Sequence, residues 1–473
     1  FQIFYLYITA LSCAANKNNI EIVEMILKQP NVNLRFSTLK NCTKLEEITI
    51  NSDTTIIMSS TFEGCTSLKN VHFQEPLNIE YIGSFAFSRC SSLKRIDLPS
   101  SVTNIENHAF DKCSSLVKIT GPSVTNIGYS AFSKCTSLEK VSFPNLSCLS
   151  FLSFDKCTSL RNVVLPNSIE VIEASTFDDC SSLEEIAIPS SVTKIENRAF
   201  RNCCSLKKIT IPPSVESILC NAFEGCSSLE EILIPPNTEY EQYLFKGCRS
   251  LKKFSFPTSL SYIPKGTFYG CTSLEEIKIP PFINKIFPDA FTGCVNLKKL
   301  RLDQTSTSFD LNLFMTCSNL STLEITNNEK TINGFDFIGI RNITEISIVS
   351  TATSISDGAF SDYSSLKKLV IPSTVKHIGN NAFSKCSSLE QIDIPPAVSF
   401  IGSYAFSSCT SLKRIEIPPL VTKIDQYTFY GCSSLEDVLI PESVTDIGEN
   451  AFENCTSLKN ISIPESVIEI GYY

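Results

Sequence analysis

Cysteine is the residue type with the greatest potential for chemistry in this sequence of 473 residues, which holds 21 cysteines and three histidines. Thiolates bind zinc, and thiols form disulfides. Zinc sites need paired Cys or His at short spacing, however, and the sequence contains no C-x-x-C pair. Most cysteines instead recur at steps of 22 to 25 residues. These periodic cysteines are Cys42, Cys65, Cys90, Cys113, Cys135, Cys157, Cys180, Cys203, Cys226, Cys248, Cys271, Cys294, Cys317, Cys386, Cys409, Cys432 and Cys455.

This spacing favours a column of buried thiols, one in each unit of a repeat. Stacking brings equivalent cysteines within disulfide range, but equivalent side chains point the same way, which is poor geometry for a disulfide. We therefore predict free thiols at a position that accepts a small apolar side chain, and no metal site. Four cysteines fall outside the period: Cys13, Cys148, Cys204 and Cys220.

Other features argue against an enzyme. His72, His108 and His377 belong to distant repeats, and the sequence has no G-x-G-x-x-G, P-loop, H-E-x-x-H or G-x-S-x-G motif. We therefore predict no catalytic, cofactor-binding or metal-ligating residue and no small-molecule substrate. The net charge of −9 has the wrong sign for neutralising phosphates, so nucleic acid is not an expected partner.

The residues between two cysteines define a repeating unit of about 23 residues. The unit that begins at Cys386 reads Cys-x-Ser-Leu-x-x-Ile-x-Ile-Pro, and Val398, Ile401, Ala405 and Phe406 follow. The Leu-x-x-Ile-x-Ile segment alternates apolar and polar residues, which predicts a short strand, and the proline ends it because proline cannot donate a ladder hydrogen bond. The apolar residues that follow predict an inward-facing turn or short helix.

A unit of this size cannot bury its apolar residues alone, so the units must stack into a repeat solenoid with one parallel sheet. If Ile340 and Tyr363 fill the cysteine position, about 19 units cover residues 37–473. The stretch 301–363 is degenerate, because it lacks the proline and then the cysteine. We predict a weak joint there, at which limited proteolysis cuts first.

These units resemble the BspA-type leucine-rich repeat, S-L-x-x-I-x-I-P-x-S-V-x-x-I-x-x-x-A-F-x-x-C, from about residue 39 to residue 473. The resemblance implies a leucine-rich-repeat horseshoe or arc. Its parallel β-sheet would lie on the concave side and its short helical or turn segments on the convex side. It also implies a non-enzymatic protein of a family often found as surface adhesins of bacteria and anaerobic protists.

Residues 1–36 precede the repeats and differ from them. Two apolar blocks at helical spacing, separated by asparagines, predict a helix pair. The pair resembles a partial ankyrin repeat, and we expect further ankyrin units before Phe1. The alternative is a signal peptide with its apolar core in residues 1–10, but a basic flank and an initiator Met are lacking. Both ends of the sequence look truncated, so an anchor could lie outside it.

The two residues before the first strand isoleucine alternate in charge from one unit to the next. Stacking would place each acidic pair between two basic pairs, which penalises a slip of one repeat more than it adds stability. The alternating pairs are Glu184-Glu185, Lys207-Lys208, Glu230-Glu231, Lys252-Lys253, Glu275-Glu276 and Lys298-Lys299, then Lys367-Lys368, Glu390-Gln391, Lys413-Arg414, Glu436-Asp437 and Lys459-Asn460.

The position between the two inward strand residues points outward, and its residues vary irregularly. Unconstrained solvated positions vary in the same way, so a reading surface and a plain solvated surface both remain open. The candidate partner contacts are His72, Asp97, Thr210, Lys278, Arg301, Glu324, Asp393 and Glu416, with apolar Val164, Ala187, Leu233, Val370 and Leu439 among them.

From these patterns we predict a protein-protein interaction scaffold. The resemblance favours a cell-surface or secreted adhesin that binds a host or matrix protein and makes no membrane contact through this segment. The alternative is an intracellular ankyrin and leucine-rich-repeat scaffold in the cytoplasm, where a reducing compartment would keep the cysteines as thiols. N-linked acceptor motifs, such as those at Asn145 and Asn342, give weak support for secretion.

Overall fold

The computed structural model describes residues 2–17, 19–27, 39–50, 52, 54–75, 77–304, 311–327, 330–332 and 342–472. It is a parallel-strand solenoid with little helix, as the sequence predicts. Its contacts divide it into two units. Unit 1 comprises residues 1–260 and 264–271, and unit 2 comprises residues 261–263 and 272–473. The expected domain boundary at residue 36 and the expected cysteine position at Ile340 lie outside the described residues.

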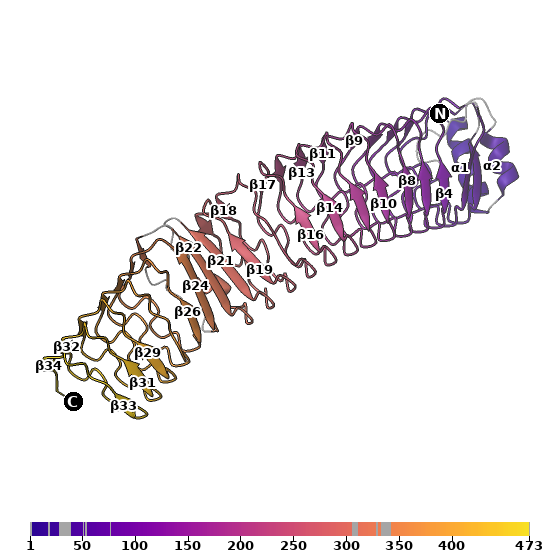
Figure 1. The fold of residues 1–473 in the computed structure, drawn as a ribbon. Helices are drawn as coiled ribbons and strands as arrows, with labels where there is room; N and C mark the ends of the chain where they lie inside the picture. Colours follow the sequence, from indigo (N-terminus) through magenta and orange to yellow (C-terminus); the bar gives the residue numbers. More distant parts are fainter. Residues whose placement is uncertain are drawn as a thin grey trace. The chain divides into compact units, whose positions relative to one another are not determined.

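The first ladder of unit 1 consists of the strands predicted from the Leu-x-x-Ile-x-Ile segments, and all of its pairs are parallel (Figure 1). Its isoleucines face inward and are buried, which the alternating pattern requires. The strands are β1 (Glu47–Ile50), β2 (Asn70–Phe73), β4 (Arg95–Asp97), β6 (Lys118–Thr120), β8 (Lys140–Ser142), β10 (Asn162–Val164), β12 (Glu185–Ala187), β14 (Lys208–Thr210) and β16 (Glu231–Leu233).

A second parallel ladder runs through the return segments, where the sequence indicated a turn or short helix. Each of its strands has two residues, and the second is the isoleucine of Val-x-x-Ile or its equivalent; the expected turns follow directly after it. In unit 1 the strands are β3 (Tyr81–Ile82), β5 (Asn104–Ile105), β7 (Asn126–Ile127), β9 (Cys148–Leu149), β11 (Val171–Ile172), β13 (Lys194–Ile195), β15 (Ser217–Ile218) and β17 (Glu239–Tyr240).

Unit 2 repeats both ladders. Its first ladder contains β19 (Glu276–Ile279), β21 (Lys299–Gln304), β22 (Thr322–Asn327), β24 (Glu345–Ser350), β26 (Lys368–Val370), β29 (Arg414–Glu416), β31 (Asp437–Leu439) and β33 (Asn460–Ile461). Its second ladder contains β18 (Tyr262–Ile263), β20 (Lys285–Ile286), β23 (Thr331–Ile332), β25 (Ser354–Ile355), β27 (His377–Ile378), β28 (Phe400–Ile401), β30 (Lys423–Ile424), β32 (Asp446–Ile447) and β34 (Glu469–Ile470). A 3₁₀ helix, η1, spans Leu311–Phe314.

The strands of the degenerate stretch are longer than those of the other repeats, and the weak joint expected there stays a prediction. The strands β21, β22 and β24 each have six residues, and they pair over their full length. Asp303, Thr326 and Val349 stand where most repeats have proline, and they lie opposite one another in the ladder. Without proline the backbone keeps its N–H, so the ladder continues past the point at which it ends elsewhere.

Most repeats contribute one phenylalanine and one cysteine to the core. Stacking of the repeats lines these residues up into a column of phenylalanines and a column of cysteines. Phe177 and Phe200, for example, lie 5.5 Å apart with an interplanar angle of 9°, and both are fully buried. Tyr363 occupies the cysteine position as predicted, because Leu366 N–H donates to its carbonyl as Leu389 N–H donates to that of Cys386. The repeats therefore stack with equivalent residues in register.

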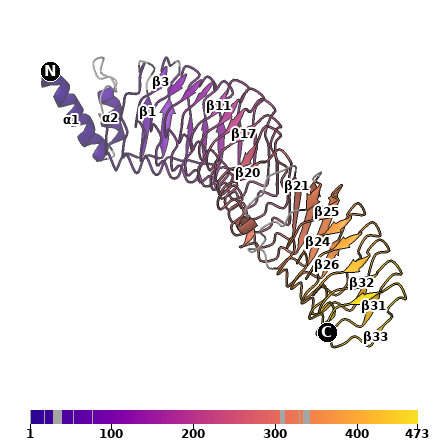
Figure 2. The same ribbon diagram turned by 90° about the vertical axis from the view of Figure 1, so that its left-hand side faces the viewer.

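Two helices, α1 (Gln2–Asn16) and α2 (Ile20–Leu27), lie at the N-terminal end of unit 1 (Figure 2). This confirms the predicted helix pair, and Asn19 caps α2 by accepting the N–H of Ile22 at 3.2 Å. The thiol of Cys42, in the first repeat, contacts the Ser12 carbonyl of α1 at 3.8 Å. The helices thus pack on the repeats, and their resemblance to an ankyrin unit stays a prediction.

Candidate functional site

The outward positions of the first ladders form the candidate surface. Each lies between two inward-facing residues, most of them buried, because side chains of a strand alternate between its faces. His72, Asp97, Thr210, Lys278, Asp393 and Glu416 are exposed there, as expected for contacts with a partner. All but Asp393 lie in the strands described above, and Asp393 follows an isolated bridge between Gln391 and Arg414. Within each unit the first ladder thus presents these side chains to solvent.

Three of the candidate residues are instead engaged with neighbouring side chains in unit 2. The guanidinium of Arg301 contacts the Glu324 carboxylate at 2.8 Å, and both side chains are only partly exposed. Lys299 also contacts Glu324 at 2.9 Å, and Lys278 contacts Asp303 at 2.7 Å. Hydrogen bonds from Lys299, together with the charge of Arg301, lower the pKa of Glu324. These contacts make Lys278, Arg301 and Glu324 poorer candidates for partner binding than His72, Asp97, Thr210, Asp393 and Glu416.

Apolar side chains on the same surface are more exposed than the sequence alone indicates. Val164 in β10 has 82% of its surface exposed and Leu233 in β16 has 76%. Val370 and Leu439, in unit 2, are also exposed. An isolated exposed apolar side chain is ordinary, but these recur at one position of the repeat.

Shallow depressions lie along the first ladders. One of about 600 Å³ is lined by His72 and Asp97, among others, and so joins two of the predicted contacts. Another of about 470 Å³, in unit 2, is lined by Val370 and Asp393. Depressions of this shape suit the side chains of a protein partner better than an enclosed small molecule.

The predicted charge alternation places opposite charges next to each other across repeats. Lys208 lies opposite Glu231 in the ladder, with its ammonium 3.4 Å from the carboxylate. Lys252 contacts Glu230 at 3.0 Å, and Arg414 contacts Asp437 at 3.5 Å. All of these side chains are at least half exposed, so each pair adds at most about 1 kcal/mol.

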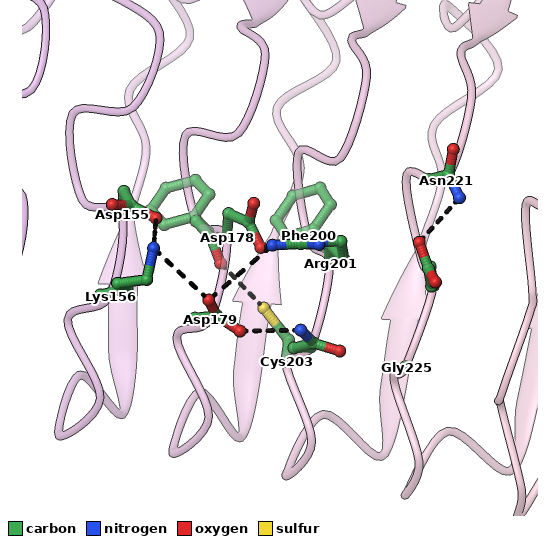
Figure 3. Close-up of polar contacts among 12 residues, drawn as sticks. Asp155, Lys156, Asp178, Asp179, Phe200, Arg201, Cys203, Asn221 and Gly225 are labelled. Carbon is green, nitrogen blue, oxygen red and sulfur yellow. Dashed lines mark hydrogen bonds and ion pairs between the residues drawn. The ribbon is translucent and has the colours of Figure 1, made fainter.

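A group of three aspartates on the turns of unit 1 is paired with two cations of the protein (Figure 3). Lys156 contacts Asp155 at 3.4 Å and Asp179 at 3.8 Å, and Arg201 contacts Asp178 at 2.8 Å. Burial raises the pKa of Asp178, and Arg201 offsets part of that rise. Two of these ion pairs, Lys156 with Asp179 and Arg201 with Asp178, join neighbouring repeats.

The cysteines of the described residues are free thiols, and the periodic ones are buried except for the half-buried Cys455. Within the described ranges, three or more His, Cys, Asp or Glu side chains nowhere gather into a group that could hold a metal ion. The described part of the chain holds no helix with the length and apolar character needed to cross a membrane.

Comparisons with known proteins agree with the repeat. The model of the BspA type leucine rich repeat region matches residues 32–160, 149–242, 238–367 and 353–473. A leucine-rich repeat protein from Bacteroides ovatus is 25% identical, with a TM-score of 0.43, over 88% of this chain and 86% of that one. A leucine rich cell surface protein from Faecalibacterium prausnitzii is 23% identical, with a TM-score of 0.34, over 90% and 87%. The T. pallidum leucine-rich repeat protein is 35% identical, with a TM-score of 0.33, over 33% and 77%.

No curated protein matches this chain. The family assignment therefore rests on the repeat model, whose matches extend from residue 32 to residue 473, together with the two ladders and the buried Cys and Phe columns. Proteins with this repeat are typically scaffolds for protein interaction. The chain belongs to the BspA-type leucine-rich repeat family.

Proposed function

We propose that the chain is a non-enzymatic surface adhesin that binds a host or matrix protein through the outward positions of its first ladders. The proposal depends most on Val164 and Leu233, whose side chains are exposed. The residues on either side of each are buried and apolar, as at most of the equivalent positions of the other repeats. Their apolar side chains suit the desolvated centre of a protein interface, and the exposed polar residues suit its rim.

Antibody labelling of intact and permeabilised cells of the source organism tests the location. Labelling of intact cells is the expected result. Labelling only after permeabilisation would contradict the adhesin proposal. It would favour the alternative, a cytoplasmic scaffold, which the free thiols of Cys13 and Cys148 support because a reducing compartment preserves them.

Binding of the purified chain to a panel of immobilised matrix proteins tests the surface. Val164→Glu and Leu233→Glu together should weaken any binding observed by about tenfold or more. Leu420→Glu is the matched control, because Leu420 is 55% exposed but lies on a turn before β30 rather than on a first ladder. Equal losses in the control and the ladder variant would count against this surface.

A further inference from the structure

Three positively charged side chains lie side by side on the first ladder of unit 1. Arg95 in β4 is opposite Lys118 in β6, and Lys118 is opposite Lys140 in β8. Adjacent strands are about 4.8 Å apart, so like charges at these positions repel one another. The order Arg95, Lys118, Lys140, here called the basic column, departs from the alternation of charge seen at Lys208 and Glu231.

Part of this charge is not neutralised within the protein. Arg95 contacts Asp97 at 2.7 Å, and that carboxylate also accepts the Thr120 hydroxyl at 2.7 Å. Lys118 and Lys140 form no ion pair with any side chain in the described part of the chain. The departure is that two lysines without an ion pair lie opposite each other on neighbouring strands, where the charge alternates elsewhere on the ladder, and departures of this kind concentrate at functional sites.

A depression of about 370 Å³ lies over the basic column. Lys118, Lys140 and Arg161 line it together with Ser142, Asn162 and a single acidic residue, Glu139. The hydroxyl and amide groups add neutral hydrogen-bond donors beside the cations. Exposed Val164 lies in β10 two residues after Asn162, and β10 lies next to β8 (Figure 1).

We propose that this depression binds an acidic, partly apolar segment of a partner protein. Carboxylates of the segment would contact Lys118 and Lys140, and an apolar side chain would cover Val164. A uniformly charged polyanion fits less well, because Asp97, Glu139 and Glu184 lie among the cations and Arg161 already contacts Glu184 at 3.3 Å. The inference rests on the proposed function, in that it names the chemistry of the partner for part of the same surface.

A short fluorescein-labelled peptide that alternates Glu with Val and Ser is the probe, and fluorescence anisotropy with the full chain is the measurement. The peptide should bind, and binding should weaken as salt rises. Lys118→Glu should weaken binding about tenfold or more. It should also raise the melting temperature, because it restores alternating charge between Arg95 and Lys140. Gain of stability together with loss of binding is the expected signature.

Lys208→Glu is the matched control, because it makes the same charge change on the same ladder but removes an existing pair with Glu231. It should leave peptide binding unchanged and lower the melting temperature. A peptide in which Gln replaces Glu should not bind.

Unchanged peptide binding in the Lys118→Glu and Lys140→Glu variants would overturn the inference. The inference would also be overturned if a sulfated polysaccharide or single-stranded RNA bound to the basic column more tightly than the peptide does. If one of these results is found but binding of matrix protein still depends on Val164 and Leu233, then only the inference fails and the proposed function stands.

Discussion

The thiol of Cys180 donates a hydrogen bond to the carbonyl oxygen of Phe154, 26 residues earlier, with 3.2 Å between sulfur and oxygen. The same contact recurs along both units, for instance from Cys409 to Phe383 at 3.2 Å. Cysteine is small and apolar enough for this position, and it still carries a weak donor. The periodic cysteines therefore connect each repeat to the one before it.

Replacing one ladder cysteine should lower stability. Cys180→Ala removes a buried sulfur and its hydrogen bond, and it should cost about 1 to 2 kcal/mol of the free energy of unfolding. Cys148→Ala should change stability by less than about 0.5 kcal/mol, because Cys148 is exposed. Denaturant titration of both variants measures the difference, and equal values would contradict the structural role of the column.

Thiol reactivity should separate the buried cysteines from the others. In native protein a polar thiol reagent should label the exposed Cys13 and Cys148 readily and the half-buried Cys204 and Cys220 more slowly. Nearly all 21 should react after denaturation without reductant. Recovery near zero would mean that the cysteines are disulfide-bonded or bound to metal, contrary to their free state in the structure.

Stability should fall in alkaline solution. Burial raises the pKa of Cys386 to about 12 and that of Cys455 to about 11, whereas an unfolded thiol has a pKa of about 8.5. The neutral thiols contribute fully below about pH 8.5, and their contribution is lost as pH rises through the folded values. Denaturant melts from neutral to strongly alkaline pH should show this fall. A Cys180→Ala/Cys203→Ala variant should have a shallower slope; an identical slope would exclude the thiols as its cause.

Glycine at a left-handed position should stabilise the chain. The residue before every periodic cysteine except Cys317 has positive φ, and Lys134, with φ of 60°, is exposed there. A non-glycine residue costs about 1 to 2 kcal/mol in this conformation, so Lys134→Gly should gain about 0.5 to 1 kcal/mol after the added chain entropy is deducted. Gly247→Ala is the converse: φ is 74°, and the nearest heavy atom to the new Cβ is 3.7 Å away, so strain alone should destabilise it.

Hydrogen exchange can decide whether the degenerate stretch is weak. Amides of β22 should exchange more slowly than those of β31, because β22 pairs over six residues with each of its neighbours. The three-residue β31 has shorter pairings. Faster exchange in residues 322–327 would support the weak joint that we predict from the missing prolines and cysteines.

Several features of the surface could not be read from the sequence. The second ladder was missed because two-residue strands have too short a pattern to distinguish them from turns. The ion pairs of Arg301 and Glu324 were missed because they depend on six-residue strands that bring neighbouring repeats together at that point. One available signal went unused: Gly and Asn recur before the cysteines, at Gly64, Gly225 and Asn202, which indicates a left-handed backbone.

The sequence by itself determined the repeat length, the parallel first ladder, the inward isoleucines and the buried cysteine column, because each follows from periodicity and the need of one unit to cover the next. Only the tertiary structure decided which outward residues are available. Whether Lys118 stays unpaired while Lys208 meets Glu231 depends on which side chain the neighbouring repeat places within reach, which is a property of the packed stack.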